Sequence, residues 1–219
     1  MTRTILRRSR VWSFPAVFAA VVLAGCTGAS GDSGTGAASP SPSQSSASAT
    51  PTPTPTLSAV YKPASAEGPA ENVPLPVMPE EAKVESKEGL EAFARYWYEL
   101  VNYGYETGDT GPVKSVSSTD CLACQNYYKV VDDGYANNDW IAAGEIEVKD
   151  AASEYILTRE GRYQALAVIQ QAGMAFYGPE GLQGTDDGDD GPAVQLFEAV
   201  YADGQWNLVF LDTMKTQSP

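Results

Sequence analysis

Apolar residues recur every three or four positions over residues 86–103, a spacing typical of an amphipathic helix. Ser86 is suited to the N-cap of this helix and Gly104 to its end. A short second helix is predicted over 112–117, and a third over about 120–137. The apolar stripe of the first helix consists of Leu90, Phe93, Ala94, Trp97, Leu100 and Val101.

Beyond Gly144 the pattern changes to an alternation of apolar and polar residues, which is typical of strands. Gly173 interrupts one predicted strand, where a bulge is expected, and Asp203-Gly204 is typical of a type I′ hairpin turn. Three N-terminal helices followed by four strands predict an α+β fold, in which a four-stranded curved antiparallel sheet wraps the first helix. The strands are predicted at 145–149 with a continuation at 155–158, at 162–177, at 194–201 and at 206–211.

The N-terminal end carries four arginines ahead of an apolar segment at 11–23. The segment is too short to cross a membrane as a helix, which takes about 20 residues. It ends in Leu-Ala-Gly-Cys at Cys26 and resembles the signal of bacterial lipoproteins, which implies that the Cys26 thiol is lipidated and becomes the new N-terminus. A plain secretory signal and an uncleaved anchor helix remain open as alternatives.

Residues 26–82 are rich in Ser, Thr and Pro up to residue 58 and predict a disordered linker, because such a segment buries too little apolar surface to offset its ordering entropy. Its less polar part, 61–79, is suited to an extended arm against the domain. The linker is either a plain spacer or O-glycosylated. We thus expect a signal peptide at 1–25, the linker at 26–82 and a folded domain at 83–215.

The chain is strongly acidic, with 28 acidic and 14 basic residues and a formal net charge of −14. Loss of the four signal arginines would lower this charge to −18. Such a domain is repelled by nucleic acid and by anionic lipid headgroups, so attachment to the membrane is expected through the lipid alone. The chain contains no histidine, which excludes Ser-His-Asp and Cys-His catalysis and HExxH zinc sites.

Three short segments carry a resemblance to known families: Phe93–Trp97, Ser118–Cys124 and Trp206–Leu208. The domain resembles an actinobacterial lipoprotein family known only as a domain of unknown function (DUF6318-like). Its order of elements resembles the NTF2-like (cystatin-like) superfamily, which implies a cone-shaped fold over about 83–215. The resemblance brings no catalytic residue.

Cys121 and Cys124 form a Cys-x-x-Cys pair at the start of the third predicted helix. A redox site is one alternative, but no strand of a thioredoxin-like unit precedes the pair. A zinc site, the other alternative, would need two further ligands. Because the domain is expected outside the cytoplasm, and Cys26 is expected to carry lipid, we predict a structural disulfide worth about 2 kcal/mol.

Large aromatic residues of the domain either fill its core or line a pocket at the wide end of the cone. An enzyme would need a buried carboxylate opposite a proton donor, and Asp150 or Asp212 with a tyrosine is a conceivable pair. No spacing singles these residues out, so we expect no catalysis and no cofactor. The predicted pocket residues are Trp97, Tyr128, Trp140, Phe176, Trp206 and Phe210.

The acidic loop 186–191 has some features of a calcium site, because Asp187, Asp189 and Glu198 stand at positions 1, 3 and 12 of a notional EF-hand loop. Gly191, at position 5 of this loop, has no side-chain oxygen to bind calcium. Pro192 stands at position 6, where an EF-hand loop needs glycine. We interpret the loop as a solvated turn and expect no metal site.

Together these observations predict a lipoprotein at the extracytoplasmic face of the cell membrane, anchored through Cys26 and carrying a non-catalytic binding domain. Its expected partner is a cell-envelope protein or a small apolar ligand, and not nucleic acid. A small-ligand carrier or enzyme that uses the cone cavity, and a thiol-disulfide protein, are the alternatives.

Overall fold

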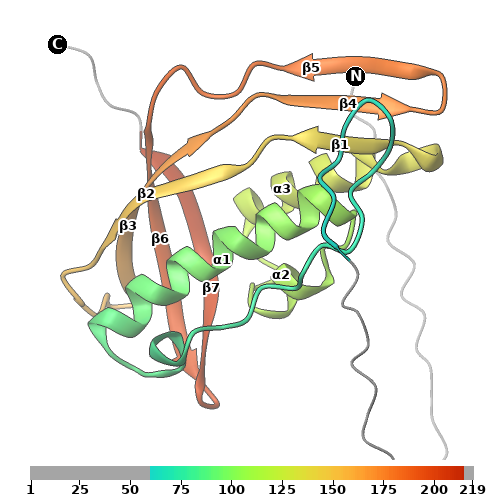
Figure 1. Cartoon of the computed structure of the whole chain (residues 1–219). Helices are drawn as coiled ribbons and strands as arrows, with labels where there is room; N and C mark the ends of the chain where they lie inside the picture. The colour runs from blue at the N-terminus through green and yellow to red at the C-terminus, as the bar shows by residue number, and fades with distance from the viewer. Residues whose placement is uncertain (1–59, 215–219) are drawn as a thin grey trace, which may run out of the picture. The chain divides into compact units, whose positions relative to one another are not determined.

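The computed structural model describes residues 60–214 (Figure 1). The predicted signal peptide, Cys26 and the first part of the predicted linker lie outside the described residues. No helix within 60–214 is long and apolar enough to cross a membrane. The helices all precede the strands and are the 3-10 helix η1 (Glu80–Lys83), α1 (Lys87–Thr107), α2 (Gly111–Ser115), α3 (Leu122–Gly134) and the 3-10 helix η2 (Ala136–Asn138).

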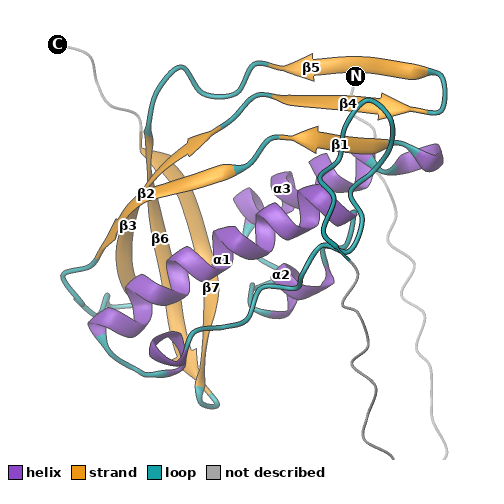
Figure 2. Cartoon of the chain, viewed as in Figure 1, coloured by secondary structure: helices purple, strands orange, loops and turns teal. Residues whose placement is uncertain are grey.

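The strands form two antiparallel sheets, one of three strands in the order β1-β4-β5 and one of four in the order β2-β3-β6-β7 (Figure 2). Helix α1 packs against β1 of the first sheet and against β2 and β3 of the second. The bounds are β1 (Trp140–Ala143), β2 (Ile146–Ala152), β3 (Tyr163–Gln171), β4 (Met174–Gly178), β5 (Gly181–Asp186), β6 (Ala193–Ala202) and β7 (Gln205–Met214).

This arrangement corrects the fold predicted from the sequence. The expected NTF2-like cone, with three N-terminal helices and a single four-stranded sheet wrapping the first of them, is wrong, because the strands divide between two sheets. The predicted strand 162–177 is in fact β3 and β4, one in each sheet. The division falls at Gly173, where a Cβ atom would lie 3.1 Å from two carbonyl oxygens. The chain also passes between the sheets from β1 to β2, at Gly144 (φ 84°), and from β5 to β6. The Gly144 N–H donates to the Gly173 carbonyl at 3.1 Å.

Two strands are absent from the sequence prediction for recognisable reasons. Strand β1 has only four residues, too few to show an alternation. Strand β5 is rich in glycine and polar residues and has no buried residue. Conversely, the predicted strand 155–158 contributes only an isolated bridge between Leu157 and Tyr163.

Helix α1 begins as its sequence predicts, because the Ser86 hydroxyl accepts a hydrogen bond from the Gly89 N–H at 3.0 Å. It runs one turn past Gly104, which is buried inside the helix, and ends at Gly108 (φ 79°). The apolar stripe faces the centre of the domain. There its aromatic residues pack with those of the four-stranded sheet, and the largest fully buried side chains are Trp97, Trp206, Tyr98, Phe93 and Phe197.

The hairpin of β6 and β7 fixes the chain that enters α1. Its turn has positive φ at both Asp203 (52°) and Gly204 (81°), as a type I′ turn requires. The Tyr201 hydroxyl donates to the Lys83 carbonyl at 2.7 Å, and the Trp206 indole N–H donates to the Val84 carbonyl at 3.0 Å. The segment before α1 is therefore part of the folded body.

Candidate functional site

Residues 60–79, which we call the strap, cross the surface of the domain (Figure 1). They belong to the predicted linker, and their contacts agree with the extended arm expected at 61–79. Lys62 and Glu71 join the two arms of its loop by backbone hydrogen bonds and by an ion pair of 2.7 Å. The Trp140 indole N–H donates to the Ser65 carbonyl at 2.8 Å, and the Tyr61 hydroxyl donates to the Glu106 carboxylate. The strap therefore lies against β1 and α1.

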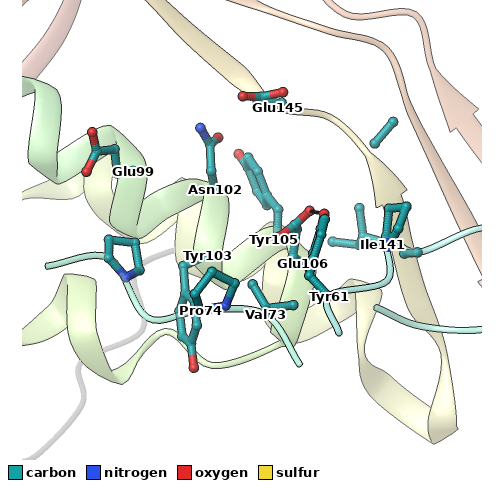
Figure 3. Close-up of a pocket in the computed structure, with 14 residues that line it drawn as sticks. Tyr61, Val73, Pro74, Glu99, Asn102, Tyr103, Tyr105, Glu106, Ile141 and Glu145 are labelled. Atoms are coloured by element: carbon teal, nitrogen blue, oxygen red, sulfur yellow. Dashed lines mark hydrogen bonds between the residues drawn. The ribbon is translucent and has the colours of Figure 1, made fainter. Parts of the chain in front are cut away.

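A groove of about 650 Å³ separates the strap from α1 and from the start of β2 (Figure 3). We call it the strap groove. Its size falls within the range of small-molecule sites, roughly 300–1,000 Å³. The residues that line it are Tyr61, Pro63, Ala64, Val73, Pro74, Pro76, Glu99, Asn102, Tyr103, Tyr105, Glu106, Ile141, Ala143 and Glu145.

One face of α1 forms the floor of the strap groove. Glu99, Asn102, Tyr103 and Glu106 recur at three- and four-residue spacing, so they lie on the same side of the helix. The seven-residue separation between Glu99 and Glu106 corresponds to about 10 Å along the helix axis. Figure 3 shows these two glutamates at opposite ends of the row.

Asn102 connects this floor to the wall opposite. Its side-chain N–H donates to the Ile146 carbonyl at 2.9 Å, and its side-chain oxygen accepts from the Ile146 N–H at 2.8 Å. This pair of hydrogen bonds fixes the first residue of β2 against α1. It thereby holds the preceding residue, Glu145, at the rim of the groove (Figure 3).

The strap groove has an uncompensated negative charge. Its lining contains three glutamates and no lysine or arginine. Within residues 60–214, the carboxylates of Glu99 and Glu145 take part in no ion pair or side-chain hydrogen bond, whereas Glu106 accepts from Tyr61. Burial raises the pKa of Glu99, and the hydrogen bond to Glu106 raises the pKa of Tyr61 to about 12. Because its lining holds three carboxyl groups and no basic side chain, the groove is suited to a positively charged ligand.

The remaining lining is apolar or aromatic. Three prolines and Val73 come from the strap, and Ile141 comes from β1. The rings of Tyr61, Tyr103 and Tyr105 stand among them. Such walls bury hydrocarbon and can offer ring faces to a cation.

The six residues that the sequence predicts for a pocket lie in several places, and none of them lines the strap groove. Trp97 and Trp206 are fully buried in the core, and Tyr128 is buried below the Lys114 ammonium group, which lies 5.0 Å from its ring centre. Trp140 holds the strap and stacks on Tyr177. Phe210 is exposed on β7.

Phe176, the sixth, lines a second cavity of about 290 Å³ between α3 and the sheets, which we call the inner cavity. A hydrogen-bond network centred on Gln195 borders this cavity. The buried Gln195 amide accepts from the Tyr98 hydroxyl and donates to the Tyr127 hydroxyl at 3.2 Å and to the Thr213 hydroxyl at 3.0 Å. Gln195, Tyr127 and Thr213 therefore pair with one another, whereas Asn126 and Asp186 of the same lining lie outside this network.

The disulfide expected from the sequence is present between Cys121 and Cys124, at the start of α3. The two residues are 1 % and 0 % exposed. Because thiol exchange requires access to a sulfur atom, this bridge is suited to a structural role.

The other acidic residues singled out in the sequence are dispersed. Asp150 forms an exposed ion pair with Arg95 at 3.4 Å, and Asp212 is exposed on β7. Asp189 accepts a hydrogen bond from the Gln171 N–H, whereas Glu198 pairs with Arg162 at 3.0 Å. Within residues 60–214, no group of three or more Cys, Asp or Glu side chains is arranged to hold a metal ion.

The strap groove could not be predicted from the sequence, because its walls are far apart in the chain. The one local signal was the polar row from Glu99 to Glu106 beside the apolar stripe of α1, which is also what any solvent-exposed helix face looks like. Only the position of the strap turns this row into the floor of a groove.

Comparison with known proteins assigns a family to the chain. The model of DUF6318, a family of unknown function, matches residues 59–212, so the chain belongs to this family. No curated protein sequence matches the chain. Among solved structures, it is similar to the intermembrane-space region of the chloroplast protein ARC6, with a TM-score of 0.42 and 9% sequence identity over 61% of this chain and 99% of that one.

Proposed function

We propose that this protein is a non-catalytic binding domain, held by a lipid on Cys26 at the extracytoplasmic face of the cell membrane, and that it binds through the strap groove. The lipoprotein-like signal supports the anchor, and the acidic composition leaves the lipid as the means of attachment. The long Ser/Thr/Pro-rich segment that follows Cys26 would carry the domain away from the membrane.

The strap groove is the observation that carries the binding role. It combines a volume of about 650 Å³ with unpaired carboxylates and apolar walls, whereas the inner cavity has less than half that volume, about 290 Å³, and its Gln195, Tyr127 and Thr213 side chains are paired with one another. The buried disulfide favours this role over that of a thiol-disulfide protein.

Photocrosslinking in intact cells tests the binding site. Tyr103, half-buried in the groove, is replaced by p-benzoylphenylalanine in the full-length protein, and Phe210, an exposed aromatic residue outside the groove, receives the same replacement as a matched control. We expect a defined increase in mass after irradiation only with the probe at position 103. Absence of an adduct at 103, or equal adducts at both positions, would contradict the proposal.

The anchor is tested separately by Cys26→Ser. We expect the variant protein to appear in the medium or to keep its signal peptide, because it lacks the thiol that would carry the lipid. Fractionation and the intact mass of the membrane-bound protein are the measurements. A cleaved variant that stays in the membrane fraction would overturn the lipid anchor without affecting the binding site.

A further inference from the structure

We propose that the ligand of the strap groove is an extended apolar chain that carries two ammonium groups about 10 Å apart, the chemistry shared by long linear diamines and by peptides with two suitably spaced lysines. This inference rests on the proposed binding function and adds the chemical class of the ligand. The carboxylates of Glu99 and Glu106 are assigned to the two ammonium groups.

The charge of the lining selects a cation. The half-buried Glu106 and the exposed Glu99 and Glu145 place three carboxylates along the groove, and its lining holds no basic side chain to offset their charge. An ammonium group beside a carboxylate would form charge-assisted hydrogen bonds with it. Glu145, near Asn102 and Tyr105, is the third negative group of the lining (Figure 3).

The spacing of the carboxylates selects two separate charges over a single compact ion. Glu99 and Glu106 lie two helical turns apart on α1, so one small cation cannot contact both of them. An extended chain of eight methylene groups separates its terminal nitrogens by about 11 Å, given carbon–carbon bonds of about 1.5 Å. In an extended peptide with the polyproline II conformation, residues i and i+3 lie on the same side of the chain and are separated by about 9 Å.

The walls between the two carboxylates select a hydrocarbon chain. Pro74, Pro76 and Val73 on the strap line the groove together with Tyr103 on α1 and Ile141 on β1. Methylene groups buried here are transferred out of water, which favours binding in proportion to the apolar area buried. The rings of Tyr61 and Tyr103 can add cation–π contacts near the ammonium groups.

Calorimetric titration of the mature full-length protein provides the test. The probes are octamethylenediamine, the shorter trimethylenediamine, the singly charged octylamine, and an extended peptide of Lys-Ala-Ala-Lys. We expect octamethylenediamine to bind about ten-fold more tightly than trimethylenediamine or octylamine, because only the long diamine reaches both carboxylates. If the peptide binds with higher affinity than octamethylenediamine, the natural ligand is assigned to a protein partner. If octamethylenediamine binds with higher affinity, the natural ligand is assigned to a free polyamine.

Charge-removing variants locate the binding. Glu99→Gln and Glu106→Gln should each weaken octamethylenediamine binding at least about three-fold. Glu180→Gln, an exposed residue in the turn between β4 and β5, removes the same charge outside the groove and should leave the affinity unchanged. Thermal unfolding of each variant checks that the fold is intact.

Equal affinity for the long and short diamines, or an equal loss with Glu180→Gln, would overturn the inference, because either result indicates unspecific attraction to an acidic protein. The two proposals fail in distinguishable ways. A crosslinked adduct at position 103 that octamethylenediamine does not displace would preserve the binding function and reject this ligand class. Absence of any adduct would reject the binding function itself.

Discussion

The strap groove and the inner cavity lie on two sides of Tyr105, which lines both, yet they differ in how their central polar side chains are paired. Beside the inner cavity, the Gln195 amide joins the hydroxyl groups of Tyr98, Tyr127 and Thr213 into one network. In the strap groove, two of the three carboxylates take part in no ion pair or side-chain hydrogen bond within the described residues.

The polar groups of the two regions therefore have different consequences: those beside the inner cavity contribute to stability, and those in the strap groove are available for binding. Buried polar groups that pair with one another contribute to a unique packing, and removing one partner is costly because the others lose their hydrogen bonds. Carboxylates without partners at the rim of a groove contribute little to stability and keep their capacity for a ligand. We therefore expect changes around the inner cavity to act on stability and changes in the strap groove to act on binding.

Gln195→Leu should give the largest effect on stability. It leaves the buried Tyr98 hydroxyl and the hydroxyls of Tyr127 and Thr213 without the amide, which we expect to cost about 3 kcal/mol of the free energy of unfolding. Urea denaturation measures this loss. Gln183→Leu, at an exposed glutamine on β5, is the matched control and should change stability by less than about 0.5 kcal/mol. Similar losses in both variants would show that the network is not the cause.

Removing the disulfide should have the next largest effect. The double variant Cys121→Ser, Cys124→Ser frees the start of α3, whose Tyr127 forms part of the inner cavity, and should lower the free energy of unfolding by about 2 kcal/mol. Because α3 does not line the strap groove, the affinity for octamethylenediamine should stay unchanged. A loss of affinity in the folded variant would show that the two regions are coupled.

Tyr61→Phe should have the smallest effect on stability, about 0.5–1 kcal/mol, because it removes a single exposed hydrogen bond from the strap to Glu106. The effect should depend on pH in one direction. The pKa of Tyr61 is raised from 10.0 to about 12 in the folded protein, first by the hydrogen bond to Glu106 and then by burial. The unfolded chain therefore loses the Tyr61 proton at lower pH than the folded chain does.

It follows that the contribution of Tyr61 is complete below about pH 10 and is lost as the pH rises through about 12. The measurement is the difference in unfolding free energy between the natural protein and Tyr61→Phe across this range. Comparing the two proteins at each pH cancels the titration of the other tyrosines. A difference that stays constant up to pH 12 would contradict the role given to this hydrogen bond.

Local sequence signals predicted those features that neighbouring residues determine. The N-cap at Ser86, the apolar stripe of α1 and the turn at Asp203-Gly204 all depend on short-range contacts or on the φ angles of single residues. The Cys121–Cys124 disulfide also spans only one turn of chain. Periodicity failed where a strand was short, as in β1, or where one apolar run was shared between two sheets, as at Gly173.

The sequence by itself determined the acidic charge, the absence of histidine and the start of α1, because these follow from composition or from residues close together in the chain. The lipid anchor on Cys26 stays a prediction from the same source. Only the tertiary structure decided the division into two sheets and the existence of the strap groove. Glu99, Glu145 and Tyr61 meet there across long separations in sequence, through the Asn102–Ile146 and Trp140–Ser65 hydrogen bonds that no local pattern reveals.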